Sequence, residues 1–282
     1  MNAGCERPIG VFDSGVGGLS VVQALWQQLP SEDVLYVADT ANCPYGPRAP
    51  AEIQSLSLGI ARYLFDHGAK AIVVACNTAS AAALQRLRDT WPEAPIVGMV
   101  PAVKPAATWS RSGVVGVLAT PMTLQGNLYQ DVVRDHAHGV QVISVVCPGL
   151  VELVERGEAR AQAAVDALRP CLAPMLEGGA DALVLGCTHY PFLREAIDTV
   201  SDARLRIFEP SEAVARQTGR VLAQRGLLAQ GSNAGRTRIV STGPAGAVRA
   251  AASQLLGVDL ETTHVAWQQG VLGESDTTRY EK

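Results

Sequence analysis

At residues 68–78 the chain reads Gly68-Ala69-Lys70-Ala71-Ile72-Val73-Val74-Ala75-Cys76-Asn77-Thr78, and at residues 179–189 it reads Gly179-Ala180-Asp181-Ala182-Leu183-Val184-Leu185-Gly186-Cys187-Thr188-His189. Each stretch begins with a Gly-Ala turn, continues as the apolar run that a buried parallel strand needs, and ends in a cysteine followed by polar side chains. Ligands of open α/β sheets bind beyond the carboxyl ends of the strands. The duplication therefore predicts two similar thiols, Cys76 and Cys187, that face one substrate.

A second repeat supports a duplicated architecture. Gly10-Val11-Phe12-Asp13-Ser14 parallels Gly116-Val117-Leu118-Ala119-Thr120, an offset of 106 positions (116 minus 10), close to the 111 positions (187 minus 76) between the two cysteines. Predicted strands and helices alternate, which favours parallel sheets flanked by helices. We therefore predict an α/β fold with two pseudo-symmetric lobes and the active site between them. Residues 1–98 and 210–282 would form the first lobe and residues 99–209 the second.

Three local predictions complete this outline. Pro121 suits the first turn of a helix, which we expect to continue to about His136. The tail after Phe208 contains a strand at 237–241 but is too short for a third domain, so it should pack on the first lobe. The polar end, 273–282, should be frayed.

Composition limits the classes of function. Hydrophobic residues make up 48% and charged residues 18% of the 282 residues, which indicates compact cores. No apolar run reaches the ~18 residues of a membrane span, and Met1 to Pro8 lacks a signal peptide's basic and apolar regions. We predict a cytoplasmic protein that does not engage a membrane. The net charge of −4 and the absence of Lys/Arg-rich runs argue against nucleic acid as a partner.

The six cysteines show neither a C-x-x-C pair nor the spacing of zinc ligands. We therefore expect free thiols in a reducing compartment and no metal site. Cys147 and Cys171 are interpreted as inert core residues. Cys76 and Cys187 differ because each follows a strand and precedes polar residues.

Two thiols on opposite sides of a carbon atom can invert its configuration. One thiolate removes the α-proton of an amino acid while a thiol on the other face delivers a proton, and the two exchange roles after each turnover. The alternative is that Cys76 and Cys187 are buried small hydrophobic residues, but their matched polar neighbours favour chemistry.

A cofactor is not indicated. Pyridoxal phosphate needs a lysine for its Schiff base, and Lys70, Lys104 and Lys282 are the only lysines, none within a motif. The turn at 13–18 is similar to a dinucleotide-binding loop, but Ser20 occupies the position of the third glycine. The turn could hold a substrate carboxylate or simply connect a strand tightly to a helix.

Four motifs, in this order, resemble those of the bacterial glutamate racemases. They are Val11 to Ser20, Asp39-Thr40-Ala41 with Pro44-Tyr45-Gly46-Pro47-Arg48, Ala75-Cys76-Asn77-Thr78-Ala79, and Gly186-Cys187-Thr188-His189-Tyr190-Pro191. The resemblance covers most of the chain. It implies two α/β domains and a cofactor-independent isomerase that interconverts L- and D-glutamate and supplies D-glutamate for peptidoglycan synthesis, and thereby for cell-wall biogenesis and cell shape.

The resemblance also implies site residues. Cys76 would act on D-glutamate with help from Asp13, and Cys187 on L-glutamate with help from His189 and Glu152. The glutamate pocket would be lined by Asp13, Ser14, Tyr45, Gly46, Asn77, Thr78, Thr120, Thr123, Thr188 and His189. A homodimer and activation by a cell-wall precursor, which some members show, are left open as partners.

Two departures from the family pattern stand out: Asn42 occupies a position that is often Arg, and Glu209-Pro210-Ser211 replaces an Asp-Ser pair. Other functions also remain as alternatives. One is racemisation of aspartate or a hydantoin, a second is a thiol hydrolase that uses Cys187 and His189, and a third is a non-catalytic protein that binds an amino acid.

Overall fold

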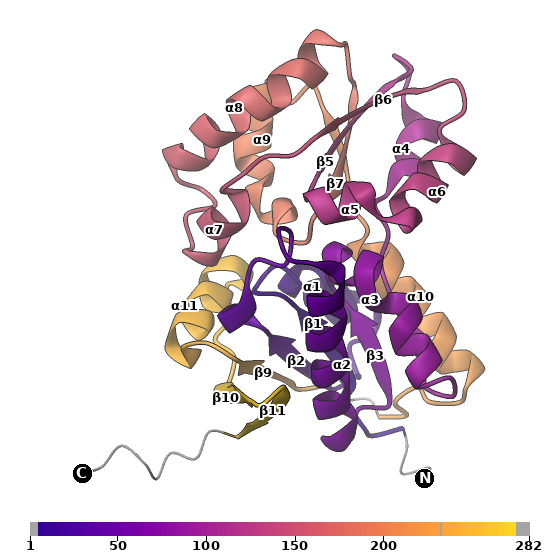
Figure 1. Cartoon of the computed structure of the whole chain (residues 1–282), viewed down its shortest axis with the longest axis vertical. Helices are drawn as coiled ribbons and strands as arrows, with labels where there is room; N and C mark the ends of the chain where they lie inside the picture. The colour runs from indigo at the N-terminus through magenta and orange to yellow at the C-terminus, as the bar shows by residue number, and fades with distance from the viewer. Residues whose placement is uncertain (1–4, 232, 275–282) are drawn as a thin grey trace.

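The computed structural model describes residues 5–231 and 233–274, and its strands form two separate sheets, one in each of the two lobes seen in Figure 1. The larger sheet, in spatial order, contains β11 (Val271–Glu274), β10 (Thr262–Gln268), β9 (Thr237–Ser241), β2 (Val34–Ala38), β1 (Ile9–Asp13), β3 (Ala71–Val74) and β4 (Ile96–Val97). All neighbours pair in parallel except β10 and β11. Strands β1, β2 and β3 are buried throughout, as expected for a parallel sheet with both faces covered.

The smaller sheet is parallel throughout. Its spatial order is β6 (Gln141–Val145), β5 (Val114–Ala119), β7 (Ala182–Gly186) and β8 (Arg206–Phe208). This order matches β2-β1-β3-β4 of the larger sheet, so the cysteine strands β3 and β7 occupy equivalent positions. The predicted α/β class, with two mostly parallel sheets, is confirmed.

Helices connect the strands. Those before β5 are α1 (Leu19–Gln28), the 3-10 helix η1 (Thr40–Asn42), α2 (Pro50–Asp66), α3 (Asn77–Thr90) and α4 (Val103–Trp109). Those between β5 and β8 are α5 (Pro121–Gln125), α6 (Asn127–His136), α7 (Leu150–Glu155), α8 (Gln162–Glu177), the 3-10 helix η2 (Tyr190–Leu193) and α9 (Arg194–Ser201). The tail adds α10 (Ser211–Gln224) and α11 (Ala245–Leu256), and β9 pairs with β2, so the C-terminal segment completes the larger sheet (Figure 1). The lobe boundaries at 98 and 210 remain a prediction, which this division of the strands supports.

The helix predicted from Pro121 to His136 is interrupted, so that prediction was wrong in extent. Gly126 is extended (φ −71°, ψ 140°) and separates α5 from α6. A Cβ atom at Gly126 would lie 2.8 Å from the Cβ of Ala81, which belongs to α3. Close packing of α3 against this segment therefore determines where the helix breaks, and a local sequence pattern does not contain that information.

Two predictions about the ends and the thiols need correction. Gly273 and Glu274 belong to β11, whereas 275–282 lie outside the described residues. Cys147 and Cys171, expected to be free, form a disulfide because α8 packs on β6 and brings their Cα atoms to 5.8 Å. Cys5, Cys43, Cys76 and Cys187 are free. In the described part of the chain, no helix has both the length and the apolar character to span a membrane.

Candidate active site

Cys76 and Cys187 follow the equivalent strands β3 and β7 and open on one small cavity between the lobes. Cys76 is also the N-cap of α3, where its sulfur accepts a hydrogen bond from the backbone N–H of Ala79 at 3.4 Å. The cavity is lined by Ser14, Pro44, Tyr45, Gly46, Cys76, Asn77, Thr78, Thr120, Val151, Cys187, Thr188 and His189. Most of the residues predicted for the pocket therefore surround one space. Pro44 and Val151 also line it, although neither was predicted as a pocket residue.

Asn77 has an unusual environment. Its side chain is buried, and neither its amide nitrogen nor its oxygen has a hydrogen-bond partner among the described residues. A buried polar group without a partner costs about 1–3 kcal/mol. Because Asn77 lines the cavity, a polar ligand would remove this cost.

The carboxylate of Asp13, which was also predicted to line the pocket, is fully buried and does not line this cavity. Its Oδ2 accepts backbone N–H groups from Gly15 at 3.3 Å and Gly18 at 3.0 Å, and Thr188 donates to Oδ1 at 3.4 Å. Burial raises the pKa of Asp13, although the nearby His189 partly opposes this. The negative charge of Asp13 acts on the thiol of Cys76, whose sulfur accepts its hydrogen bond from the backbone of Ala79.

Burial raises the pKa of Cys76 well above its ordinary value, and the negative charge of Asp13 raises it further. Cys76 is therefore a neutral thiol in the ligand-free site. A thiol near a buried carboxylate can deliver its proton and recover another from that carboxylate.

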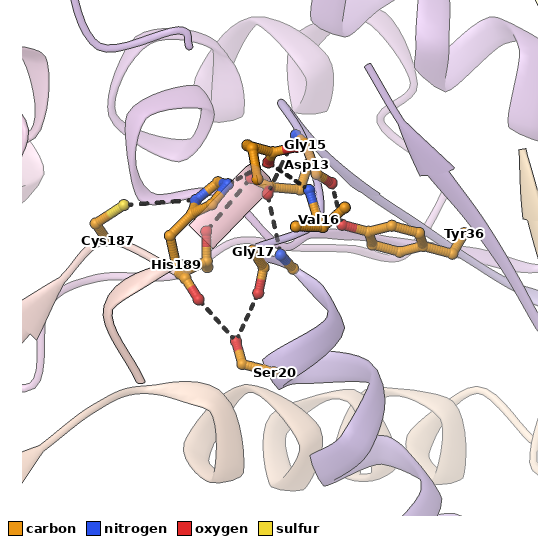
Figure 2. A network of polar contacts seen from close by, with 11 residues as sticks. Asp13, Gly15, Val16, Gly17, Ser20, Tyr36, Cys187 and His189 are labelled. Atoms are coloured by element: carbon orange, nitrogen blue, oxygen red, sulfur yellow. Dashed lines mark hydrogen bonds and ion pairs between the residues drawn. The ribbon is translucent and has the colours of Figure 1, made fainter. Parts of the chain in front are cut away.

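His189 connects the second thiol to a carboxylate. Its Nδ1 lies 3.7 Å from Sγ of Cys187, and its Nε2 lies 2.5 Å from Oε1 of Glu155, which also accepts the backbone N–H of Val16 at 2.7 Å. Burial alone would lower the pKa of His189, but hydrogen bonds to Cys187, Cys43 and Glu155 raise it well above its ordinary value. Figure 2 shows His189 between Cys187 and the turn that follows β1.

The pKa of Glu155 is lowered, because its hydrogen bonds to His189 and Val16 outweigh the effect of burial. His189 and Glu155 therefore form an ion pair. An imidazolium beside Cys187 stabilises negative charge on its sulfur.

The predicted assistant Glu152 is not the residue that contacts His189. Glu152 is exposed on α7, and no hydrogen bond joins it to Cys187 or His189 in the described structure. Glu155 lies three residues later on the same helix and makes this contact. The hydrophobic pattern of α7 did not distinguish the two glutamates, because only the packing of α7 against η2 selects one of them.

The glycine-rich turn is explained by contacts from the second lobe. A Cβ atom at Gly17 would lie 2.3 Å from Nδ1 of His189, and one at Gly15 would lie 1.9 Å from Oε1 of Glu155. The N–H groups of Gly15, Val16 and Gly18 donate to the carboxylates of Asp13 and Glu155. Of the two interpretations left open for this turn, the structure favours a tight strand-to-helix connection over a carboxylate-binding loop.

Asp39 orders the loop that carries Tyr45 and Gly46. The Tyr45 hydroxyl donates to Oδ2 of Asp39 at 2.5 Å, and Thr242 and Nε1 of Trp267 each donate to Oδ1 at 2.8 Å. Asn42, one of the departures from the family pattern, also donates to this carboxylate at 3.0 Å. The C-terminal strands thus hold one wall of the cavity.

Three threonines form a chain next to this loop, where a Cβ atom at Gly46 would lie 3.3 Å from the Cβ of Thr120. Oγ1 of Thr120 lies 2.9 Å from Oγ1 of both Thr78 and Thr123. Thr78 and Thr120 line the cavity, whereas Thr123 supports Thr120 from behind. In the other departure, Glu209 accepts the backbone N–H of Ser211 at 2.7 Å and does not line the cavity.

Comparison with known proteins agrees with this geometry. Residues 9–218 match the model of the family described as Asp/Glu/Hydantoin racemase. The chain belongs to this family. It is 50% identical, over 228 residues, to the glutamate racemase of Roseiflexus sp. (strain RS-1), a match that covers 81% of this chain and 84% of that protein.

Solved structures from the same family share the whole architecture. Glutamate racemase isoform RacE1 from Bacillus anthracis superposes with a TM-score of 0.85 at 32% identity, covering 95% of this chain and 99% of that one. The Escherichia coli glutamate racemase, in complex with L-glutamate and the activator UDP-MurNAc-ala, superposes with a TM-score of 0.80 at 31% identity, covering 92% and 97%. The similarity thus extends over both sheets.

Proposed function

We propose that this protein interconverts L- and D-glutamate without a cofactor, with Cys76 and Cys187 as the two acid/base groups. The observation that carries the proposal is the placement of two free thiols, from equivalent strands of the two sheets, on one buried cavity. Each thiol has its own assistant: Asp13 beside Cys76, and the His189–Glu155 pair beside Cys187. The family and its glutamate racemase members supply the reaction class and the substrate.

In the L-to-D direction, the thiolate of Cys187, stabilised by the His189 imidazolium, removes the α-proton of L-glutamate. The neutral thiol of Cys76 then delivers its proton to the opposite face, so one C–H bond breaks and another forms. The reverse direction begins from a Cys76 thiolate and a Cys187 thiol. Asp13 and His189 serve as proton partners that restore the starting protonation states.

Substrate recognition would use neutral donors and acceptors. None of the residues that line the cavity is Lys or Arg, so the carboxylates of glutamate would be bound by the Asn77 amide, by hydroxyl groups and by backbone N–H groups. The hydroxyl groups available are those of Ser14, Thr78, Thr120 and Thr188. The unpaired amide of Asn77 is the strongest single indication of such a ligand.

The cavity is small in this conformation. Its volume of about 20 Å³ accommodates roughly one water molecule. Glutamate is several times larger, so it would enter when the two lobes are further apart, and closure on the substrate would then exclude water from the thiols.

Several finer points remain proposals. The product D-glutamate would serve peptidoglycan synthesis, and the cytoplasmic location, a homodimer and activation by a cell-wall precursor stay predictions. The Escherichia coli relative contains UDP-MurNAc-ala as its activator, which motivates a direct test of that compound here.

The decisive experiment is incubation with L-glutamate in D₂O without added cofactor, followed by circular dichroism and proton NMR. The proposal predicts loss of optical activity together with exchange of the α-proton for deuterium. Binding without exchange would indicate a non-catalytic amino-acid-binding protein. Faster turnover of aspartate or a hydantoin in the same assay would assign a different substrate to the same two thiols.

A further inference from the structure

A third free thiol lies beside the catalytic machinery. Cys43 follows η1, Glu155 ends α7 and His189 follows β7, so three segments distant in sequence converge here. One ligand atom from each of these residues lies within 4.8 Å of the other two. The charges of His189 and Glu155 both act on the Cys43 thiol.

We propose that Cys43, Glu155 and His189 form a zinc-binding site through which Zn²⁺ reversibly inhibits the enzyme. The donor set is one sulfur, one oxygen and one imidazole nitrogen, which suits zinc and disfavours magnesium or calcium, since these prefer oxygen ligands. Three protein ligands with an open fourth position is an arrangement that zinc commonly adopts. Zinc bonds of about 2.0–2.3 Å bring tetrahedral ligands to within about 4 Å of each other, so small side-chain movements suffice.

Neighbouring backbone groups leave space for the three side chains and orient one of them. Gly15 lies against this cluster, where a Cβ atom would stand 1.9 Å from Oε1 of Glu155 and 3.1 Å from Sγ of Cys43. The backbone N–H of Val16 orients the Glu155 carboxylate. Pro44, the residue after Cys43, and His189 both line the substrate cavity, so the cluster adjoins that cavity.

Zinc would replace protons. The ion displaces one proton from the Cys43 thiol and the proton that His189 Nε2 shares with Glu155, and both protons pass to solvent. Because zinc binds in exchange for these protons, its affinity should increase with pH. With Nε2 bound to zinc, His189 can no longer be an imidazolium, so it loses its proton-transfer role beside Cys187. The inhibition, though not the binding, rests on the proposed function.

The test uses the full-length, metal-free protein, with the Cys147–Cys171 disulfide intact, together with Zn²⁺ and a competing chromophoric zinc indicator. We expect one zinc ion per chain, and Cys43→Ser should weaken binding by at least about 100-fold, since even loss of an outer-shell group costs roughly 10–100-fold. Cys5→Ser, which changes a free thiol outside the cluster, is the control and should bind as the unmodified protein does. Unchanged affinity in Cys43→Ser would overturn the proposal.

Inhibition is measured in the same three proteins, each normalised to its own activity without zinc. Cys43→Ser should need at least about 100-fold more zinc for half-inhibition. Equal sensitivity would mean that zinc acts at Cys76 and Cys187 instead.

If Cys43→Ser folds poorly, alkylation of the unmodified protein with iodoacetamide, with and without zinc, tests whether Cys43 binds the ion. Zinc should protect Cys43, as located by peptide mass spectrometry, and protection of only Cys76 and Cys187 would refute the site. Zinc binding without any racemisation would reject the proposed function but retain the site.

Discussion

Replacing Glu155 by Gln tests the assignment of the carboxylate that supports Cys187. Glutamine keeps the size of the side chain and can still accept the N–H of Val16, but it removes the negative charge 2.5 Å from Nε2 of His189. The two side chains are 19% and 2% exposed, so solvent screens their interaction only weakly. A hydrogen bond between charged groups is worth about 1.5–3 kcal/mol, which corresponds to roughly a 10- to 100-fold decrease in kcat.

The assay follows racemisation by circular dichroism from pure L-glutamate and from pure D-glutamate. The raised pKa of His189 keeps it charged as pH increases, so the loss of Glu155 should move the alkaline decline of activity to lower pH. Glu152→Gln, on the exposed side of the same helix, is the matched comparison and should change kcat by less than about twofold. If Glu152→Gln lowered kcat more than Glu155→Gln, Glu152 would be the carboxylate that assists Cys187, as predicted from the sequence. The assignment of Glu155 would then be refuted.

The remaining predictions concern the thiols, the assistants, cofactors and stability. Cys76→Ala and Cys187→Ala should each abolish racemisation while circular dichroism shows an intact fold; near-normal turnover of either in both directions would exclude two-base catalysis. His189→Asn should lower kcat more from L-glutamate and Asp13→Asn more from D-glutamate, by roughly 100-fold. The ratio of kcat/KM values cannot change, because the enantiomers have equal free energies, and equal slowing in both directions would show that the assistants are not specific to one face. Activity should resist EDTA and hydroxylamine; inhibition reversed by a metal or by pyridoxal phosphate would contradict the cofactor-free mechanism. Lys70→Met, which leaves Glu32 buried without its partner, should lower the free energy of unfolding by about 3–5 kcal/mol in urea titrations, whereas Arg249→Met at the exposed pair with Asp259 should leave the midpoint unchanged.

The sequence determined the class of fold. Buried parallel strands are continuous apolar runs, and such runs can be recognised in the sequence without knowing which other residues they contact. The duplicated runs before Cys76 and Cys187 predicted equivalent strands, and β3 and β7 hold equivalent positions in their sheets. The position of each cysteine at a strand's carboxyl end also followed from sequence. The roles proposed for these thiols await the variants described above.

Only the tertiary structure decided which distant groups meet. Glu155 rather than Glu152 reaches His189, Gly126 interrupts a helix where α3 packs, and Cys147 pairs with Cys171, each through contacts between segments far apart in the chain. The cluster of Cys43, Glu155 and His189 has no recognisable spacing in the sequence for the same reason. Periodicity reports which side of an element is buried, whereas the partner of a polar side chain depends on how the lobes pack together.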